Sequence, residues 1–299
     1  MRTESVPFDL KLDCCVVCRG PLSQFQSAFE GGSALRYEAC RRCGLVQMNP
    51  RPSDSWIAHF YEHDYRAVSG DVDAQVSAAT AGPKADNLKG IIGIPPARHL
   101  DLGCSTGVLL RTVGADVQVG IEPGSSHRET AAISGLEVHK SLDDLVSSDP
   151  PLFDLISLVH VLEHIADPIR LLETLRCLLT SDGRLLVEVP NLPQHRSYEP
   201  GHLLAFTHRT LVSSLGAAGF AVDSVYFHNV PQGGPGRRKN LVLIARAGPV
   251  TDQRGALGLG RVRMQRVVWV LPGRLLRWAR RQRRRGSRIL RSRLGIDHR

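Results

Sequence analysis

Short apolar runs alternate with amphipathic segments along the middle of the chain. The apolar runs have the length of buried strands, and the segments between them repeat their apolar positions at helical spacing. Strands are expected at residues 98–102, 117–121, 136–139, 153–159, 184–189, from 219 onward and at 240–245, and helices at 108–113, 125–133, 168–179 and 207–218. Strands that alternate with helices in this way predict a parallel sheet. The expected fold class is therefore α/β, with a Rossmann-like sheet of seven strands.

Local signals mark where several of these elements begin and end. Asp167 followed by Pro168 is a typical helix start, because proline is well tolerated at the first helical position. Ser125 or Ser126 is expected to cap the helix that follows it. The sequence Asp182-Gly183 predicts a turn before the strand at residues 184–189.

The chain divides into four parts. Residues 1–52 hold two Cys-x-x-Cys pairs and short strands, and two prolines near the end of this part break regular structure. Residues 53–92 are expected to form a helical linker, in which Ser53 or Asp54 caps a short helix. Residues 93–247 hold the α/β domain, and residues 248–299 form a basic, amphipathic tail.

One stretch of the α/β domain combines a strand, a glycine-containing turn and the start of a helix. Residues 98–110 read RHLDLGCSTGVLL, and Gly103 and Gly107 let the backbone approach a ligand closely because they carry no Cβ. Glu122 ends the next apolar run, 21 positions after Asp101. A strand, turn, helix, strand and acid at this spacing are typical of folds that hold an adenosine ribose.

The residues of the turn narrow the type of nucleotide. A dinucleotide-binding turn would have glycine at two further positions, which are Ser105 and Val108 here. The chain has no GxxxxGK[ST] sequence, which excludes a P-loop. The expected ligand is an adenosine compound without phosphates.

Three segments then resemble a known family. LDLGCSTG (100–107), VGIEP (119–123) and FDLISLVHVLEH (153–164) are similar to segments of class I S-adenosylmethionine (SAM)-dependent methyltransferases. EVPN (188–191), PGHLLAFT (200–207) and AGF (218–220) resemble a bacterial branch of this family. Members of that branch often carry an N-terminal zinc ribbon and occur among sugar- and envelope-modifying enzymes. The resemblance extends over residues 12–247.

The resemblance implies a set of cofactor contacts. Asp101 would bind or order water near the cationic end of SAM, and Glu122 would accept both ribose hydroxyls, since a carboxylate has two acceptor oxygens. Leu142 and Asp143 stand where members of the family contact adenine. The implied cofactor-binding residues are Asp101, Gly103, Cys104, Gly107, Glu122, Leu142 and Asp143.

Two cysteine pairs indicate a metal site. Cys15 and Cys18 are separated by 21 residues from Cys40 and Cys43, and four thiolates in two such pairs fit tetrahedral zinc. Four cysteines leave no open position for catalysis, so the predicted Zn²⁺ is structural. Cys14 could replace Cys15, and redox-active or incidental cysteines are the alternative interpretation.

Methyl transfer to a hydroxyl also needs a group that accepts the hydroxyl proton. Histidine titrates near neutrality, and the chain has 12 histidines. His164 follows Glu163 just beyond a buried strand, and His202 lies in a loop after the next strand. We expect His164 first, and His202 second, as the catalytic base. The alternative for each, and more so for His160, is a structural histidine that caps a helix or packs in the core.

Positive charge is concentrated in the tail. The net charge is +9, yet residues 261–299 hold 14 arginines and one acid, so the rest of the chain is mildly acidic. Apolar residues and Trp278 between the arginines are typical of a helix on an anionic membrane surface. A solvated tail and nucleic-acid binding are the alternatives. The sequence opens without a secretory signal and has no bilayer-spanning run, so we expect a cytoplasmic protein, peripheral to the inner face of the membrane.

These features predict a SAM-dependent methyltransferase that O-methylates a hydroxyl of a glycan, a lipid-linked sugar or a related small molecule. One alternative is an RNA methyltransferase that clamps RNA with its zinc ribbon and tail. The ribbon has few aromatic residues for base stacking, and the chain has no Asn/Asp-Pro-Pro-Tyr sequence, which weighs against RNA. A second alternative is a SAM-binding scaffold without turnover.

Overall fold

The computed structural model describes residues 8–30, 33–60, 81–194, 201–229 and 239–251. Residues 252–299 of the predicted basic tail lie outside these residues, and with them the expected contact with a membrane surface or nucleic acid. The middle of the expected helical linker lies outside them too. Within the described part of the chain, no helix has both the length and the apolar character needed to cross a bilayer.

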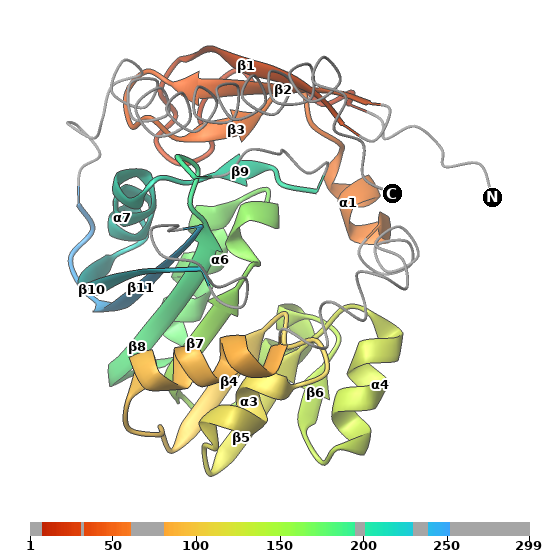
Figure 1. The fold of residues 1–299 in the computed structure, drawn as a ribbon, viewed down its shortest axis with the longest axis vertical. Coiled ribbons are helices and arrows are strands. Elements are labelled where there is room, and N and C mark those ends of the chain that lie inside the picture. Colours follow the sequence, from red (N-terminus) through yellow and green to blue (C-terminus); the bar gives the residue numbers. More distant parts are fainter. Residues whose placement is uncertain (1–7, 31–32, 61–80, 195–200, 230–238, 252–299) are drawn as a thin grey trace, which may run out of the picture.

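The predicted seven-stranded sheet is confirmed (Figure 1). Its strands lie in the order β10-β11-β8-β7-β4-β5-β6, and the last five of these run parallel. Strand β11 is antiparallel to both of its neighbours. The strands are β4 (Arg98–Leu102), β5 (Val117–Ile121), β6 (Glu137–His139), β7 (Phe153–Val159), β8 (Leu179–Pro190), β10 (Phe220–His228) and β11 (Asn240–Ala247).

The four helices that the amphipathic pattern predicts in the α/β part are present. They are α3 (Val108–Val113), α4 (Ser125–Ile133), α6 (Pro168–Cys177) and α7 (His208–Ala217). Helix α5 (Leu142–Ser147) and a 3₁₀ turn, η2 (Leu162–His164), after β7 were not predicted and add to them. Before the sheet, Ser53 caps α1 (Asp54–His59), and residues 81–92 are helical. Asp167 caps α6 through Arg170, with Pro168 at the first helical position, as expected.

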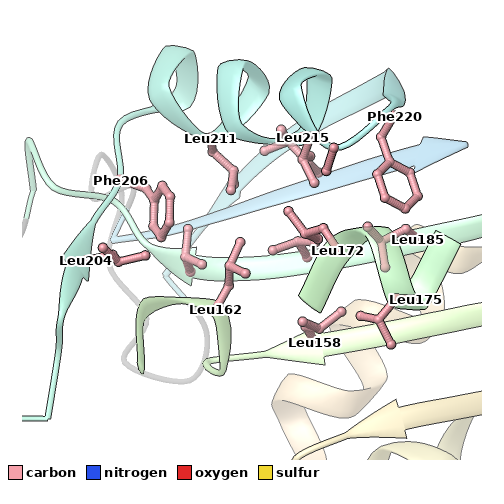
Figure 2. Packing of buried hydrophobic residues seen from close by; sticks show 14 of the residues in the cluster. Leu158, Leu162, Leu172, Leu175, Leu185, Leu204, Phe206, Leu211, Leu215 and Phe220 are labelled. Carbon is pink, nitrogen blue, oxygen red and sulfur yellow. The ribbon is translucent and has the colours of Figure 1, made fainter. Parts of the chain in front are cut away.

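The central strands bury side chains on both faces. On β7, Leu155 belongs to a cluster with the helix at residues 81–92 and α3, whereas Leu158 belongs to the main cluster on the other face. Leu186 and Leu185 on β8 divide in the same way, because successive residues of a strand point to opposite faces. Figure 2 shows the main cluster, where leucines of α6 and α7 pack over β7 and β8. Burial on both faces explains why these strands are almost continuously apolar.

A second, antiparallel sheet joins the N-terminal part of the chain to the α/β part (Figure 1). It has the order β1-β2-β3-β9, and its strands are β1 (Leu22–Glu30), β2 (Ser33–Cys40), β3 (Val46–Met48) and β9 (Leu204–Ala205). Strand β9 lies between β8 and α7 in the sequence, so the α/β part completes the N-terminal sheet. Buried residues of both parts form one continuous cluster.

Two local predictions are wrong. The cap of α4 is Gly124, and Ser125 and Ser126 lie within the first helical turn, because the Glu122 carboxylate accepts the Gly124 N–H at 2.9 Å. Residues 182–183 are not a turn between elements but part of β8, at an irregularity where Leu179 pairs with Phe153 and Arg184 pairs with Leu155. Glycine is suited to this irregularity, since a Cβ at Gly183 would lie 2.9 Å from a backbone oxygen.

Candidate active site

The candidate residues gather where the parallel strands end. Asp101 on β4 lies opposite Gly120 on β5 and Ser157 on β7, so the three strands end at one edge of the sheet. The turn after β4, the acid after β5 and the histidine segment after β7 therefore meet there. Ligands of open α/β sheets bind at this edge.

The turn between β4 and α3 has the backbone that its glycines allow. Gly103 and Gly107 have φ of +75° and +76°, in the left-handed region that favours glycine. A Cβ on Gly103 would lie 2.6 Å from Cγ2 of Val161, in the segment after β7. The turn and the histidine segment are thus in direct contact.

Glu122 lies beside this turn, as its spacing predicts. Its carboxylate is buried and accepts backbone N–H groups from Ser105 and Gly124, each at 2.9 Å. Ser105 itself has a left-handed φ of +51°. The acid and the glycine turn therefore form one polar wall at the edge of the sheet.

Asp101 is held by a buried hydrogen-bond chain that the sequence motif did not predict. Ser157 donates its hydroxyl to Oδ1 of Asp101 at 2.6 Å, and Nε2 of His99 lies 2.8 Å from the same hydroxyl oxygen. Burial lowers the pKa of His99 to about 3, so its ring is neutral and Nε2–H donates to Ser157. Burial raises the pKa of Asp101 to about 7, and the charge of Glu122 adds to the rise, while the Ser157 bond opposes it. The feature of the sequence that could have indicated this chain is the presence of two polar residues, His99 and Ser157, within otherwise apolar strands.

The other implied cofactor residues lie at the same edge with differing exposure. The Cys104 thiol is buried, and a Cβ on Gly120 would lie 2.5 Å from its sulfur, so it points at β5. Leu142 and Asp143 begin α5 after β6, where Leu142 is half-buried and Asp143 is exposed. The backbone of Cys104 is held within the turn, because its N–H donates to the Ile121 carbonyl and its carbonyl accepts the Gly107 N–H.

The two predicted histidines lie together. Their ring centroids are 4.8 Å apart in an edge-on arrangement. Nδ1 of His164 lies 2.8 Å from the carbonyl oxygen of Gly201, which only accepts, so Nδ1 carries the proton and Nε2 carries the lone pair. Burial lowers the pKa of both His164 and His202. Both rings are therefore neutral at pH 7, which is the state that a proton acceptor needs.

His160 is a third histidine in this region, but it is bound on both sides. Nδ1 lies 3.1 Å from Glu163 and Nε2 lies 3.0 Å from Glu188. Burial and the charge of Lys84 lower the pKa of His160, but the bonds to the two carboxylates outweigh them and raise it to about 9. Burial raises the pKa of Glu163, yet the bond to His160 and the nearby histidines lower it to about 2. His160 is thus a charged structural group, in line with the alternative given to it from sequence.

The four predicted zinc ligands also meet. The sulfurs of Cys15, Cys18, Cys40 and Cys43 lie within 4.8 Å of one another, with Cys15–Cys43 at 3.6 Å and Cys18–Cys40 at 3.4 Å. A tetrahedral zinc with Zn–S bonds of about 2.3 Å separates its sulfurs by about 3.8 Å, so the cluster fits the ion. Cys14 is not part of the cluster. Backbone N–H groups of Arg42 and Cys43 donate to the Cys40 sulfur, which suits a thiolate.

The N-terminal sheet holds the segment that carries His202. Tyr37 on β2 donates its hydroxyl to the His202 carbonyl at 2.9 Å. The carbonyl of Leu203, the residue after His202, accepts the Met48 N–H at 2.7 Å. Strand β9 then pairs with β3. Leu204 and Phe206 lie over Leu162 of η2 in the main cluster (Figure 2). This packing places His202 beside His164; both were expected near the acceptor, but no sequence pattern predicted that the N-terminal sheet holds His202 there.

Comparisons with known proteins identify the domain that carries these residues. Residues 77–225 match the family model described as a methyltransferase domain. This part of the chain is a methyltransferase domain. It is 28% identical over 118 residues to a ubiquinone biosynthesis O-methyltransferase of Xanthomonas campestris pv. campestris, covering 36% of this chain and 49% of that protein. The corresponding protein of Xylella fastidiosa is 30% identical over 118 residues, with 36% and 48% covered.

The 118 aligned residues span about half the length of these curated relatives. Among solved structures, the plantazolicin methyltransferase BpumL, crystallised with a monoazolic desmethylPZN analog and S-adenosylhomocysteine, superimposes with a TM-score of 0.50 at 16% identity. That match covers 64% of this chain and 94% of BpumL. It shows a shared fold.

Proposed function

We propose that this chain is a SAM-dependent methyltransferase that O-methylates a hydroxyl of a small-molecule acceptor. The curated relatives are O-methyltransferases, which supports oxygen as the methylated atom. A glycan or lipid-linked sugar is the acceptor class that the sequence resemblance implies, and it stays part of the proposal. Zn²⁺ in the four-cysteine cluster is proposed as a structural ion.

The contact between the glycine turn and the histidine segment is the main support for this proposal. Val161 lies against Gly103, so the segment that leads to His164 continues directly from the wall formed by the glycine turn and Glu122. A nucleotide held by the turn would therefore have a neutral histidine pair as its neighbour. This is the arrangement that methyl transfer to a hydroxyl requires, since the acceptor must be both aligned and deprotonated.

The residues of the turn fit SAM. Asp101 and Glu122 are two buried acids at one edge, and the charge of Glu122 adds to the rise in the pKa of Asp101. A ligand with a positive charge would relieve this repulsion, whereas a phosphate would increase it. When bound, SAM supplies a methyl group on a sulfonium that the acceptor oxygen displaces. Glu122 offers two acceptor oxygens for the ribose hydroxyls, and the Ser157 bond orients Asp101.

The histidine pair would remove the proton of the acceptor. The Gly201 carbonyl fixes the His164 proton on Nδ1 and leaves the lone pair on Nε2, which is the atom proposed to take the hydroxyl proton. His202 is the second candidate for this role, because its ring lies against that of His164. Burial keeps both rings neutral until that step.

The test uses the full chain and methyl-labelled SAM with an extract of the host cell, separated into lipid, glycan, RNA and small-molecule fractions. We expect label in a hydroxyl-bearing lipid, glycan or small molecule. Glu122→Gln should weaken SAM binding in calorimetry at least about tenfold, because it removes one charged acceptor. His164→Ala or His202→Ala should slow transfer more than about threefold with SAM binding unchanged. His208→Ala, at an exposed histidine, serves as the matched control.

Each other outcome contradicts a part of the proposal. Tight SAM binding without label in any fraction would identify a scaffold. Label confined to RNA would show that the acceptor is RNA and not a small molecule, glycan or lipid. If neither histidine variant slowed transfer, the histidine base would be wrong.

A further inference from the structure

We propose that Glu163, His164 and His202 bind one divalent transition-metal ion beside the acceptor position. The three residues each offer a ligand atom, and these atoms lie within 4.8 Å of one another. Glu163 and His164 belong to η2, and His202 is brought to them by β9. The site is separate from the four-cysteine cluster and differs from it in ligand type.

The first supporting observation is an oxygen of Glu163. The residue is 1% exposed, and its Oε1 pairs with His160 at 3.1 Å. Its Oε2 is buried and has no hydrogen-bond partner within the described residues. A buried charged oxygen without a partner is strongly unfavourable, so native structures pair such atoms with a donor or a metal ion. The other two ligand atoms of the cluster lie beside this carboxylate.

The second observation is the orientation of the ligands. Nδ1 of His164 donates to the Gly201 carbonyl, which directs Nε2 as the coordinating atom. Metal-binding histidines almost always donate their other N–H to a carbonyl or carboxylate in this way. Glu163 is oriented in the same manner by His160, which Glu188 holds from its other side. Each of these two ligands thus has a partner that fixes its geometry.

The ligand set defines the class of ion. Two imidazoles and one carboxylate suit Mn²⁺, Fe²⁺, Co²⁺ or Zn²⁺, whereas Mg²⁺ and Ca²⁺ prefer oxygen ligands alone. Three protein ligands leave coordination positions open for a substrate oxygen. The thiolate cluster is softer and takes zinc first, so the two sites can be filled with different ions.

The metal site deepens the proposed function and rests on it for its role in turnover. A hydroxyl of the acceptor would bind the ion and lose its proton to bulk water, because a bound cation lowers the pKa of a coordinated oxygen. The resulting oxyanion would then form the O–CH₃ bond as the S–CH₃ bond of SAM breaks. The products are a methyl ether and S-adenosylhomocysteine. In this scheme the ion replaces the histidine base of the proposed function: Nε2 of His164 coordinates the metal and does not take the proton, and His164→Ala or His202→Ala should still slow transfer.

The test measures metal binding without SAM or acceptor. The untagged full chain, loaded with one equivalent of Zn²⁺, is titrated with Mn²⁺ while electron paramagnetic resonance follows the free ion. We expect one Mn²⁺ per chain. Glu163→Gln and His202→Ala should each weaken this binding at least about tenfold. His208→Ala should leave it unchanged, since that histidine is exposed and outside the cluster.

The design separates the metal site from the proposed function. If the zinc-loaded chain takes up no Mn²⁺, or if both variants bind it as the native chain does, the metal site is wrong. Should Glu163→Gln fail to fold, as judged by circular dichroism, His202→Ala alone decides. Methyl transfer without Mn²⁺ uptake would leave the proposed function standing and overturn the metal site. Mn²⁺ uptake without SAM binding would support the site and overturn the function.

Discussion

Gly103 and Gly93 have the same backbone conformation in different surroundings. Their φ angles are +75° and +77°, a region in which an L side chain is strained. A Cβ on Gly103 would meet Val161 at 2.6 Å, whereas a Cβ on Gly93 would meet no atom within 4 Å. The two positions therefore separate the effect of backbone strain from the effect of close contact.

Gly103→Ala and Gly93→Ala are predicted to differ. Each should lower the free energy of unfolding by about 1–2 kcal/mol through backbone strain. Gly103→Ala should lose more, and it should also weaken SAM binding, because Val161 must move away from the turn. Urea denaturation and calorimetry with SAM measure the two effects. Equal stability and equal SAM affinity in both variants would contradict the close contact.

Single residues show how far sequence patterns reach. Gly103 and Glu122 could be placed from the motif alone, because the unit from β4 through the turn and α3 to the end of β5 is local and its spacing places both. His99 and Ser157 could not, because they meet only when β4 and β7 pair in a particular register. The same holds for His160, whose two carboxylate partners come from different elements.

At the scale of elements, the short strand β9 ties the segment that carries His202 to the N-terminal sheet. It has two residues, pairs with β3, and begins two positions after His202, whose carbonyl accepts the Tyr37 hydroxyl. A strand of this length has no periodic pattern, so no sequence rule could predict it. The long strands and amphipathic helices, by contrast, were predicted to within a few residues, because each buries a continuous apolar face.

Tyr37→Phe is predicted to slow methyl transfer without changing SAM binding. The substitution removes only the hydroxyl that binds the His202 carbonyl, so His202 is less well held beside His164. The free energy of unfolding should fall by about 1 kcal/mol, typical of one hydrogen bond. Transfer rates, calorimetry and urea denaturation test this. Tyr226→Phe, at a residue 38% exposed, is the control, and an equal loss of rate in both variants would contradict the role of Tyr37.

At the scale of the whole molecule, the cysteine cluster and the methyltransferase domain belong to one core. Buried residues run without a break from Cys15 and Cys40 through Leu204 to Leu211 on α7. The boundary predicted at residue 52 from composition stays a prediction, but the packing crosses it. Composition could not reveal this, because it shows the character of each segment and not which segments touch.

Removal of zinc is therefore predicted to affect the whole chain. Chelation, or Cys40→Ser, should lower the melting temperature by at least about 5 °C in a single transition and should slow methyl transfer. Cys177→Ser, at an exposed cysteine, should change neither. Calorimetric melting and zinc analysis provide the measurement. Two separate transitions, with the second unchanged, would show that the ribbon folds independently.

The pairing of β3 with β9 has a consequence for how this gene can change. A recombination that moved the methyltransferase domain without residues 8–52 would leave β9 as an uncovered strand edge and would expose buried Leu203 and Leu204. Such a product would be prone to aggregate and would lose the hold on His202. The two parts are therefore expected to be inherited together, and their histories of descent should coincide.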